Sequence, residues 1–354
     1  MGLFGKKKGL VGVDIGSSAV KAVELKVGGK GGDEYQLLNI GMESLPPEAI
    51  VDGAIMDSGA VIDAIQRLFQ DNKIKTGDVA TGVSGNAVIV KKIALPQMSA
   101  EELDESITWE AEQYIPFDIQ DVRLDYELLD SGSGGNMDVL LVAVKRDKIS
   151  EYTSAITQAG RNAAIVDVDV FALQNCYEIN YGVDPGRVVA LLNIGASIMN
   201  VNVVKGGISV FNRDIASGGN QYTDAIQKDL NLSFEQAEAL KKGEQVEGAA
   251  PESLHPILQA VSENVAMEIQ KTFDFFRATS QEDRIDQIFL SGGTAKIHGL
   301  KDLLQDRFGA PVELLNPFLN VRYSEKDFNP EYLEDIGPSA AIAVGLAARR
   351  VGDR

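Results

Sequence analysis

A short pattern of an apolar strand, a glycine-serine turn and a second strand occurs twice in this sequence. The copies are residues 10–18 and 191–197, and they align at an offset of 179 residues, the difference between positions 14 and 193. In both copies an apolar run precedes the turn, as is typical of a strand buried on both faces, and a second strand-like run follows it. The repeat predicts two similar half-sites in two similar domains that face each other.

Turns built from glycine and serine favour phosphate as a ligand. They expose consecutive backbone N–H groups and a hydroxyl, which together form a concave set of donors for an anion. Each charge-assisted hydrogen bond contributes about 1.5–3 kcal/mol, so a few of them hold a polyphosphate without a large basic patch. The formal charge of −19 opposes a nucleotide only at long range, because salt screens distant charges. For either copy alone, an ordinary hairpin is the alternative interpretation.

A third segment, residues 288–295, is an apolar strand that runs into a double-glycine turn. Residues 296–308 follow it with leucines on one face at helical spacing. Glycines allow a flat ring to lie against bare backbone, although the segment alone is compatible with any strand-to-helix connection. Together and in this order, the three segments resemble the nucleotide-binding signature of the actin-like ATPase superfamily, which includes actin, sugar kinases, heat-shock chaperones and the cell-division protein FtsA.

The resemblance implies an α/β protein with the actin-like ATPase fold, in which two lobes have duplicated ribonuclease-H-like cores. The length of 354 residues is sufficient for two such cores. An FtsA-type inserted subdomain is expected in the first lobe. The expected parts are a first lobe at residues 1–186 (core 1–77 and 166–186, inserted subdomain 78–165), a second lobe at 187–336 (helical insertion at about 224–284) and a C-terminal connecting helix at 337–354.

The resemblance also implies ATP and Mg²⁺ as ligands. In the superfamily the first two turns bind the β and γ phosphates from opposite lobes, and the third carries the adenosine. The carboxylate of Asp14 is then oriented toward hydrated Mg²⁺. The turn at 217–220 and three positions of a later helix resemble further contacts, although a plain helix N-terminus and a solvated helix face are the alternatives. The implied cofactor-binding residues are Asp14, Gly16, Ser17, Ser18, Lys21, Asn193, Gly195, Ala196, Ser197, Gly218, Gly219, Glu268, Lys271, Thr272, Gly292, Gly293, Thr294 and Ala295.

Asn193 departs from the superfamily pattern, which usually has aspartate at this position. An amide cannot act as a base, and it holds Mg²⁺-bound water less strongly than a carboxylate does. A general base is hard to assign, because the candidates Asp167 and Asp169 lie at the end of an expected strand and are compatible with simple solvation. We therefore assign no catalytic residue and expect at most slow ATP hydrolysis.

The segment between the two phosphate turns distinguishes this chain from actin. A small antiparallel sheet with two helices is expected there, and a capping box of Ser99 and Glu102 begins the first helix. Residues 108–117 resemble the PilM family of type IV pilus assembly proteins, and the likeness extends over essentially the whole chain. In that family, a groove between the first lobe's core and the insertion binds the N-terminal cytoplasmic tail of the inner-membrane protein PilN.

Aromatic side chains at the start of this groove are implied as anchors for the tail, because such residues dominate peptide recognition. The alternative is that Trp109 and Phe117 fill the core of the inserted subdomain. The implied partner-binding residues are Trp109, Tyr114, Ile115 and Phe117.

The composition bears on other kinds of partner. An acidic chain without a basic cluster argues against nucleic acid, and the absence of about 20 consecutive apolar residues argues against direct membrane insertion. Residues 1–4 are expected to form a solvated tail. Cys176 is expected to be a small core residue in a reducing cytosol. FtsA-type proteins continue into an amphipathic membrane helix beyond the position where this sequence stops, so recruitment through another protein is the simpler expectation.

The resemblance implies a cytoplasmic ATP-binding adaptor of type IV pilus assembly, held at the inner face of the inner membrane through partner proteins. The adaptor is expected to dock the PilN tail and to couple nucleotide state to assembly, with other pilus assembly components and further copies of itself as additional partners. An FtsA-like filament-forming protein and a small-molecule kinase of the same fold are the alternatives. The inserted segment and the short C-terminus favour the adaptor.

Overall fold

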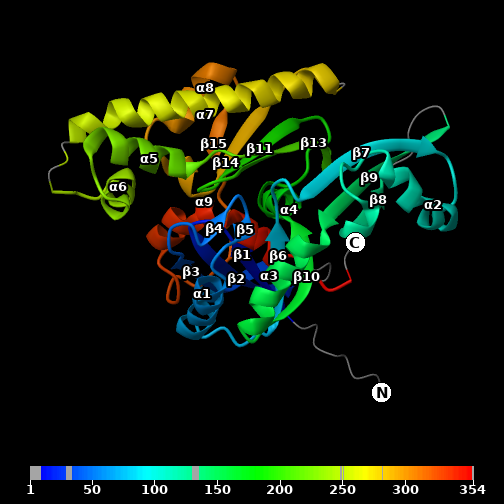
Figure 1. Cartoon of the computed structure of the whole chain (residues 1–354), viewed down its shortest axis with the longest axis horizontal. Helices are drawn as coiled ribbons and strands as arrows, with labels where there is room; N and C mark the ends of the chain where they lie inside the picture. Colours follow the sequence, from blue (N-terminus) through cyan, green and yellow to red (C-terminus); the bar gives the residue numbers. More distant parts are fainter. Residues whose placement is uncertain are drawn as a thin grey trace.

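The computed structural model describes residues 9–28, 34–129, 135–247, 249, 251–280 and 282–352 of the chain. The expected tail at residues 1–4 lies outside these ranges. The described part forms two lobes, each built on a β-sheet, and a third, smaller sheet projects from the first lobe (Figure 1).

The sheets of the two lobes share one topology. In each, three consecutive antiparallel strands are followed by a strand that pairs in parallel with the first of them. The first sheet has the order β10-β6-β1-β2-β3-β16 and the second has the order β13-β12-β11-β14-β15. The sequence repeat thus corresponds to a repeat of strand connections. The strands of the first sheet are β1 (Val11–Ile15), β2 (Ala19–Gly28), β3 (Glu34–Ser44), β6 (Asp78–Val83), β10 (Asn162–Val168) and β16 (Val321–Arg322).

The strands of the second sheet are β11 (Val188–Ile194), β12 (Met199–Lys205), β13 (Ile208–Ile215), β14 (Gln287–Ser291) and β15 (Val312–Leu314). The strands that lead into the two turns, β1 and β11, lie inside their sheets and are almost entirely buried. Their apolar residues therefore face cores on both sides, as the continuous hydrophobic runs predict.

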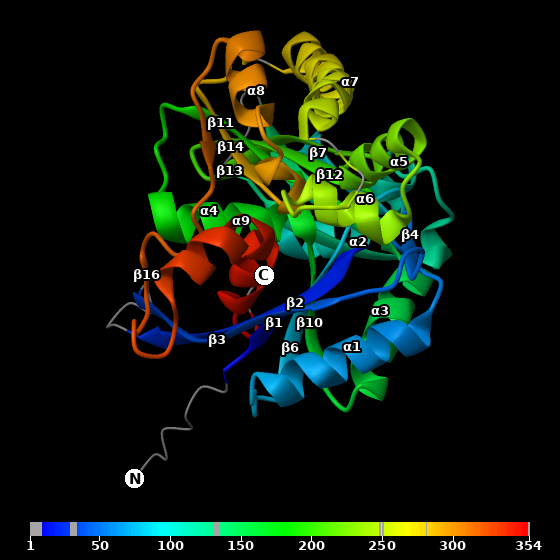
Figure 2. The ribbon, with the colours of Figure 1, turned by 90° about the vertical axis from the view of Figure 1, so that its left-hand side faces the viewer.

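Two helices form the layer between the sheets, as Figure 2 shows. They are α4 (Asp169–Tyr181) and α9 (Pro330–Ala347), and together with strands of both sheets they enclose one shared hydrophobic core. Small residues permit this close packing, because a Cβ at Gly345 would clash with the carbonyl of Ala172. Cys176 of α4 is buried in the same layer.

The outer faces of the sheets are covered by the remaining helices of the lobes. Helices α1 (Ser58–Asp71) and α3 (Arg146–Gln158) cover the first sheet. The second is covered by α5 (Gly219–Leu230), α6 (Phe234–Lys241), α7 (Pro251–Thr279) and α8 (Leu300–Phe308). Shorter elements are the hairpin of β4 (Ile50–Val51) and β5 (Ala54–Ile55) and the 3₁₀ turn η2 (Gly293–Lys296). None of the helices in the described ranges has both the length and the apolar character needed to cross a bilayer.

The projecting layer consists of β7 (Val88–Pro96), β8 (Val122–Leu128), β9 (Asn136–Lys145), the helix α2 (Ala100–Glu112) and the 3₁₀ turn η1 (Ile119–Asp121). It has its own apolar core. The expected capping box at the start of α2 is present, with Ser99 and Glu102 each accepting a hydrogen bond from the other's backbone.

The strand pairings differ from the expected part boundaries in two places. β6 and β10 belong to the first lobe's sheet, so the separate three-stranded layer is narrower than residues 78–165. β16 pairs with β3 of the first sheet, although the second lobe was expected to extend to residue 336. Apolar strands look alike in sequence whichever sheet they join, because pairing depends on long-range contacts.

Candidate functional site

The two glycine-serine turns meet across the boundary between the lobes. The hydroxyl oxygens of Ser17 and Ser197 lie in direct hydrogen-bonding contact. Each turn closes in the same way, with the N–H of Gly16 donating to Ala19 O at 3.1 Å and the N–H of Gly195 donating to Ile198 O at 3.0 Å. The sequence repeat therefore produces two turns of matching geometry that face each other.

The backbone amides at the tips of these turns are available to a ligand. Those of Ser17, Ser18, Ala196 and Ser197 donate to no protein acceptor within the described ranges. Backbone N–H groups are obligatory donors, and a group of them in a concave turn suits an anion such as phosphate. The donor set thus fits a polyphosphate held from both lobes.

An ion pair lies beside the first turn. Lys21 Nζ is 3.0 Å from Asp14 Oδ2, and both side chains are largely buried. The pair follows from the strand register, because Asp14 of β1 is opposite Lys21 of β2. A carboxylate and an ammonium at the mouth of an anion-binding turn are the groups that a hydrated cation and a phosphate require.

The second turn has amides in the equivalent positions. Asn193 of β11 is opposite Asn200 of β12, and Asn193 Nδ2 donates to Asn200 Oδ1 at 2.9 Å. The half-sites are therefore alike in backbone and different in charge. Only the first provides a carboxylate for a metal ion.

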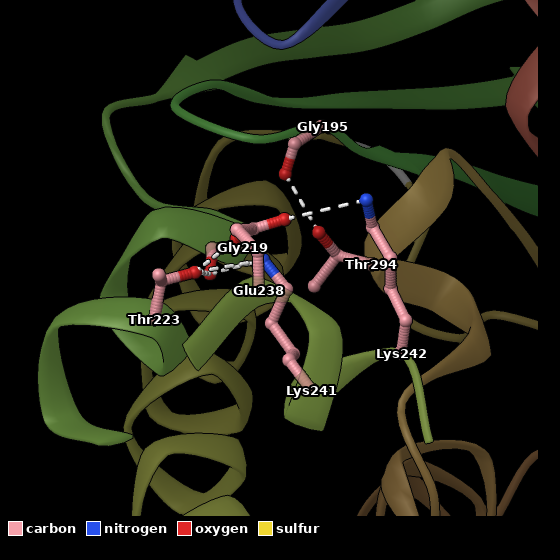
Figure 3. Close-up of polar contacts among 7 residues, drawn as sticks. All are labelled: Gly195, Gly219, Thr223, Glu238, Lys241, Lys242 and Thr294. Carbon is pink, nitrogen blue, oxygen red and sulfur yellow. Dashed lines mark hydrogen bonds and ion pairs between the residues drawn. The ribbon is translucent and has the colours of Figure 1, made fainter. Parts of the chain in front are cut away.

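The third expected segment packs directly against the second turn, as does the turn before α5 (Figure 3). Thr294 Oγ1 and the N–H of Gly219 both donate to the carbonyl of Gly195, at 2.8 and 2.9 Å. A Cβ at Gly218 would clash with the same carbonyl, and Gly292 has φ of 85°, which favours glycine. The structure brings these three segments together. Gly293 and Ala295 lie in η2 beside them.

Two residues of α6 complete this cluster, although the sequence pattern did not single them out. Lys241 Nζ donates to Thr223 Oγ1 at 2.8 Å and to Gly219 O at 3.2 Å, and it pairs with Glu238 (Figure 3). Burial favours the neutral form of Glu238, but the Lys241 ammonium and hydrogen bonds from Lys241 and Thr223 outweigh it and lower the pKa of this carboxyl. In sequence the pair resembles any solvated i,i+3 pair, so only its spatial neighbours reveal it.

The residues expected to approach adenosine from α7 are not brought to this cluster. Glu268 and Lys271 form an ion pair of 2.6 Å at the exposed surface of α7, and Thr272 is buried and donates to the carbonyl of Glu268. Among the described residues, no hydrogen bond or ion pair joins these three to the glycine turns. The assignment of these three residues to the adenosine therefore stays a prediction.

Asp167 is not a simply solvated carboxylate. It is 7% exposed, and Arg349 Nη1 lies 2.6 Å from its Oδ2. Burial raises the pKa of the Asp167 carboxyl, and the Arg349 guanidinium opposes the rise. This side chain therefore serves to connect β10 to the end of α9.

Asp169 is the better candidate for a general base. It begins α4, and a Cβ at Gly82 would clash with its carboxylate, so the side chain occupies a tight space. Burial raises the pKa of Asp169 to about 7, the nearby Asp14 carboxylate adds to the rise, and a hydrogen bond with Ser84 opposes it. A carboxyl with a pKa near the working pH is suited to accepting a proton from water.

A pocket of about 490 Å³ lies where the projecting layer joins the first lobe. Its walls come from the β4–β5 hairpin, the segment before β7 and the start of α3. Several of its lining side chains are charged. The charged ones are Asp52, Lys145, Asp147, Lys148 and Glu151, and Ser84 and Asn86 are polar and neutral.

The four expected partner anchors do not form one surface. Trp109 of α2 is 73% exposed, whereas Ile115 is 7% exposed and belongs to the core of the projecting layer. Tyr114 and Phe117 pack partly on that core. Ile115 therefore has a structural role, whereas the exposed Trp109 does not fill that core as the alternative interpretation proposed. Phe117 is adjacent to the pocket, since Lys145 Nζ of the pocket wall lies 4.3 Å from the centre of its ring.

The duplicated sheets, the facing turns and the helix layer between them define the actin-like ATPase fold. FtsA of Staphylococcus epidermidis is 25% identical over 358 residues, covering 87% of this chain and 74% of that protein. MreB5 of Spiroplasma citri bound to AMPPNP is 14% identical and has a TM-score of 0.51, covering 96% of this chain and 95% of that chain. At this identity the likeness shows the shared fold.

The family described as type IV pilus assembly protein PilM matches residues 12–351, and the chain belongs to this family. It is also similar to a chain of the solved PilM-PilN type IV pilus biogenesis complex. The TM-score is 0.86 at 29% sequence identity, and the match covers 98% of this chain and 100% of that chain. The resemblance expected from residues 108–117 is confirmed.

Proposed function

We propose that this actin-like pilus assembly protein binds ATP with Mg²⁺ between its lobes and docks the N-terminal cytoplasmic tail of PilN at the pocket beside its projecting layer. The proposal that ATP binds here rests on the contact of Ser17 with Ser197, because this contact brings together two turns whose backbone amides are available to a ligand. The similarity to MreB5, whose solved structure contains AMPPNP, supports the same ligand class.

In this proposal the first turn and Lys21 bind phosphate oxygens, while Asp14 holds Mg²⁺ through water. The ion supplies charge neutralisation for the phosphates and polarises the bond to be broken. The second turn binds the phosphates from the other lobe, and the cluster of Gly219, Glu238, Lys241 and Thr294 borders the nucleoside. Asp169 accepts the proton of the attacking water.

Hydrolysis is expected to be slow. Asn193 cannot share in holding metal-bound water as an aspartate does, so a single lobe carries this role. We therefore propose that the presence of bound nucleotide, and not the rate of its hydrolysis, matters for the function of the protein.

The pocket is suited to a cationic segment of a partner. Asp52 and Asp147 are exposed on its walls and have no ion pair within the described part of the chain. Its lysines are already engaged, Lys148 with the carbonyl of Gly53 and Lys145 over the ring of Phe117. The solved PilM-PilN complex supports PilN as the partner, and attachment to the inner membrane then occurs through PilN.

Calorimetric titrations test the two parts separately. ATP with Mg²⁺ is expected to bind at one site per chain, and a synthetic peptide of the PilN N-terminal tail is expected to bind at another. Asp147→Asn should weaken the peptide at least about fivefold and leave ATP binding unchanged. Asp302→Asn, an exposed change on α8, is the matched control. Absence of ATP binding refutes the nucleotide part, and equal peptide affinity of the two variants refutes the pocket.

A further inference from the structure

Four polar side chains form a row across the sheet of the second lobe. They lie in register on the adjacent strands β14, β11, β12 and β13. Ser291 Oγ is 3.4 Å from Asn193 Oδ1, Asn193 Nδ2 donates to Asn200 at 2.9 Å, and Asn200 Nδ2 donates to Asp214 Oδ1 at 2.8 Å. Cross-strand neighbours share one face of a sheet, so the row is a continuous feature of the fold.

The row continues into the first lobe. The backbone N–H of Gly85 donates to the second carboxylate oxygen of Asp214 at 2.6 Å. Gly85 lies between Ser84 and Asn86, both of which line the partner pocket. One end of the row is therefore at the adenosine-side turn that follows Ser291, and the other end is at the wall of the pocket.

The hydrogen bonds of the row all run in one direction. The Asp214 carboxylate only accepts, so Asn200 must present its amide N–H₂ to Asp214 and its oxygen to Asn193. Asn193 must then donate to Asn200, which an aspartate cannot do. The row gives a structural reason for Asn193, the departure from the superfamily pattern.

The side chain of Ile198 also reaches the first lobe. Ile198 directly follows the second phosphate turn, and its Cδ1 would lie 3.3 Å from a Cβ added at Gly85 and 3.6 Å from one added at Gly53. Both glycines belong to the first lobe. Gly53 lies in the β4–β5 turn, where its carbonyl accepts from Tyr152 Oη at 2.9 Å. Ile198 thus joins the phosphate turn to two segments of the pocket wall.

We propose that this row, together with Ile198, couples occupancy of the nucleotide site to the shape of the partner pocket; the proposal rests on the function proposed above. Ser17 and Ser197 touch, so a triphosphate bound between the turns must separate them. The second sheet carries Ser197, Ile198 and Asp214 together, and its displacement changes the bond of Asp214 to Gly85. A ligand shifts a second site in this way only when it favours one lobe arrangement.

The test measures affinity of the fluorescent tail peptide with AMPPNP and Mg²⁺ and without nucleotide. In the unaltered protein the two affinities are expected to differ by about fivefold or more. Asp214→Asn leaves a single acceptor oxygen, so either the bond from Asn200 or the bond from Gly85 is lost. Ile198→Ala removes the side-chain atoms that lie nearest to Gly53 and Gly85. Each is expected to bring the two affinities within about twofold while AMPPNP still binds. Asp302→Asn, which is exposed and outside the row, should behave as the unaltered protein.

Retention of the full affinity ratio in both variants overturns the proposal. Equal affinities in the unaltered protein, with both ligands bound, overturn it while the proposed function stands. Loss of either ligand from the unaltered protein refutes the proposed function and the coupling with it. Should the variants not fold, hydrogen exchange at the Gly85 amide of the unaltered protein decides: exchange that AMPPNP accelerates supports the link, and unchanged exchange overturns it.

Discussion

Lys21 in the first lobe and Asn200 in the second occupy equivalent positions, each on the second strand of its repeat and bonded to the residue opposite. Lys21 pairs with Asp14 at 3.0 Å, and Asn200 accepts from Asn193 at 2.9 Å. One duplicated backbone thus carries an ion pair in one half and an amide pair in the other. The two halves therefore differ in chemistry: the first provides charged groups, and the second provides a hydrogen bond with a fixed direction.

Lys21→Met should destabilise the protein and weaken its binding of ATP. The change leaves Asp14 as an unpaired charge in a largely buried place, and breaking such a pair costs about 3–5 kcal/mol. Arg67→Met is the control, because its ion pair with Glu43 is more exposed and contributes at most about 1 kcal/mol. Urea unfolding and ATP titration measure the two effects. Equal losses of stability in both variants contradict the assigned role of Lys21.

Lys241→Met should lower ATP affinity by about tenfold, because it removes a cation that organises Thr223, Gly219 and Glu238 at the glycine cluster. Lys271→Met should have no effect, since Lys271 pairs with Glu268 at the surface of α7. Calorimetry of both variants compares the site in the structure with the site expected from the sequence. If Lys271→Met lowers ATP affinity and Lys241→Met does not, the adenosine lies at α7 and not at the glycine cluster.

Asp169→Asn should reduce ATP hydrolysis at least about tenfold, because the amide cannot accept a proton. The same change should stabilise the fold at pH 8 by at least about 1 kcal/mol, since the raised pKa of Asp169 means that its charged form is disfavoured when folded. At pH 5 the carboxyl is protonated in the folded protein but still ionised in the unfolded chain, so the stabilisation should be smaller than at pH 8 and should vanish only below the ordinary pKa of 3.8. Thermal unfolding at both pH values checks the sign. Equal stabilisation at both contradicts the pKa assignment.

The thiol of Cys176 should resist modification in the folded protein. The side chain is buried in the layer between the sheets, and burial raises the pKa of the thiol, so little thiolate forms. A colorimetric disulfide reagent at pH 8 should report no free thiol until denaturant is added, and one thereafter. Rapid reaction in native buffer would show that this layer opens readily.

The sequence predicted the features that depend on local chemistry. The repeat located both turns, and the expected capping box at Ser99 is present in the structure. The connecting helix, expected at residue 337, begins at Pro330 because Asn329 caps it and proline fits the first turn of a helix.

Features that depend on distant contacts could not be predicted from the sequence. Glu238 and Lys241 were not predicted as site residues, because only their contacts with Gly219 and Thr223 place them at the glycine cluster. Ile115 resembles any apolar residue in sequence, and only the structure shows that it belongs to the core of the projecting layer. The polar row could not be predicted either, because in the sequence three of its residues are isolated polar residues in apolar strands. Their register, and hence their connection, follows only from strand pairing.

A cross-link between the two turns tests the central claim most directly, that a nucleotide binds between them. In the double variant Ser17→Cys with Ser197→Cys, the two sulfurs replace hydroxyl oxygens that touch, so a disulfide should form without nucleotide. Cys176 is buried and should not interfere. Saturating ATP with Mg²⁺ is predicted to block the cross-link by separating the turns. Cross-linking at the same rate with and without ATP and Mg²⁺ would contradict the account.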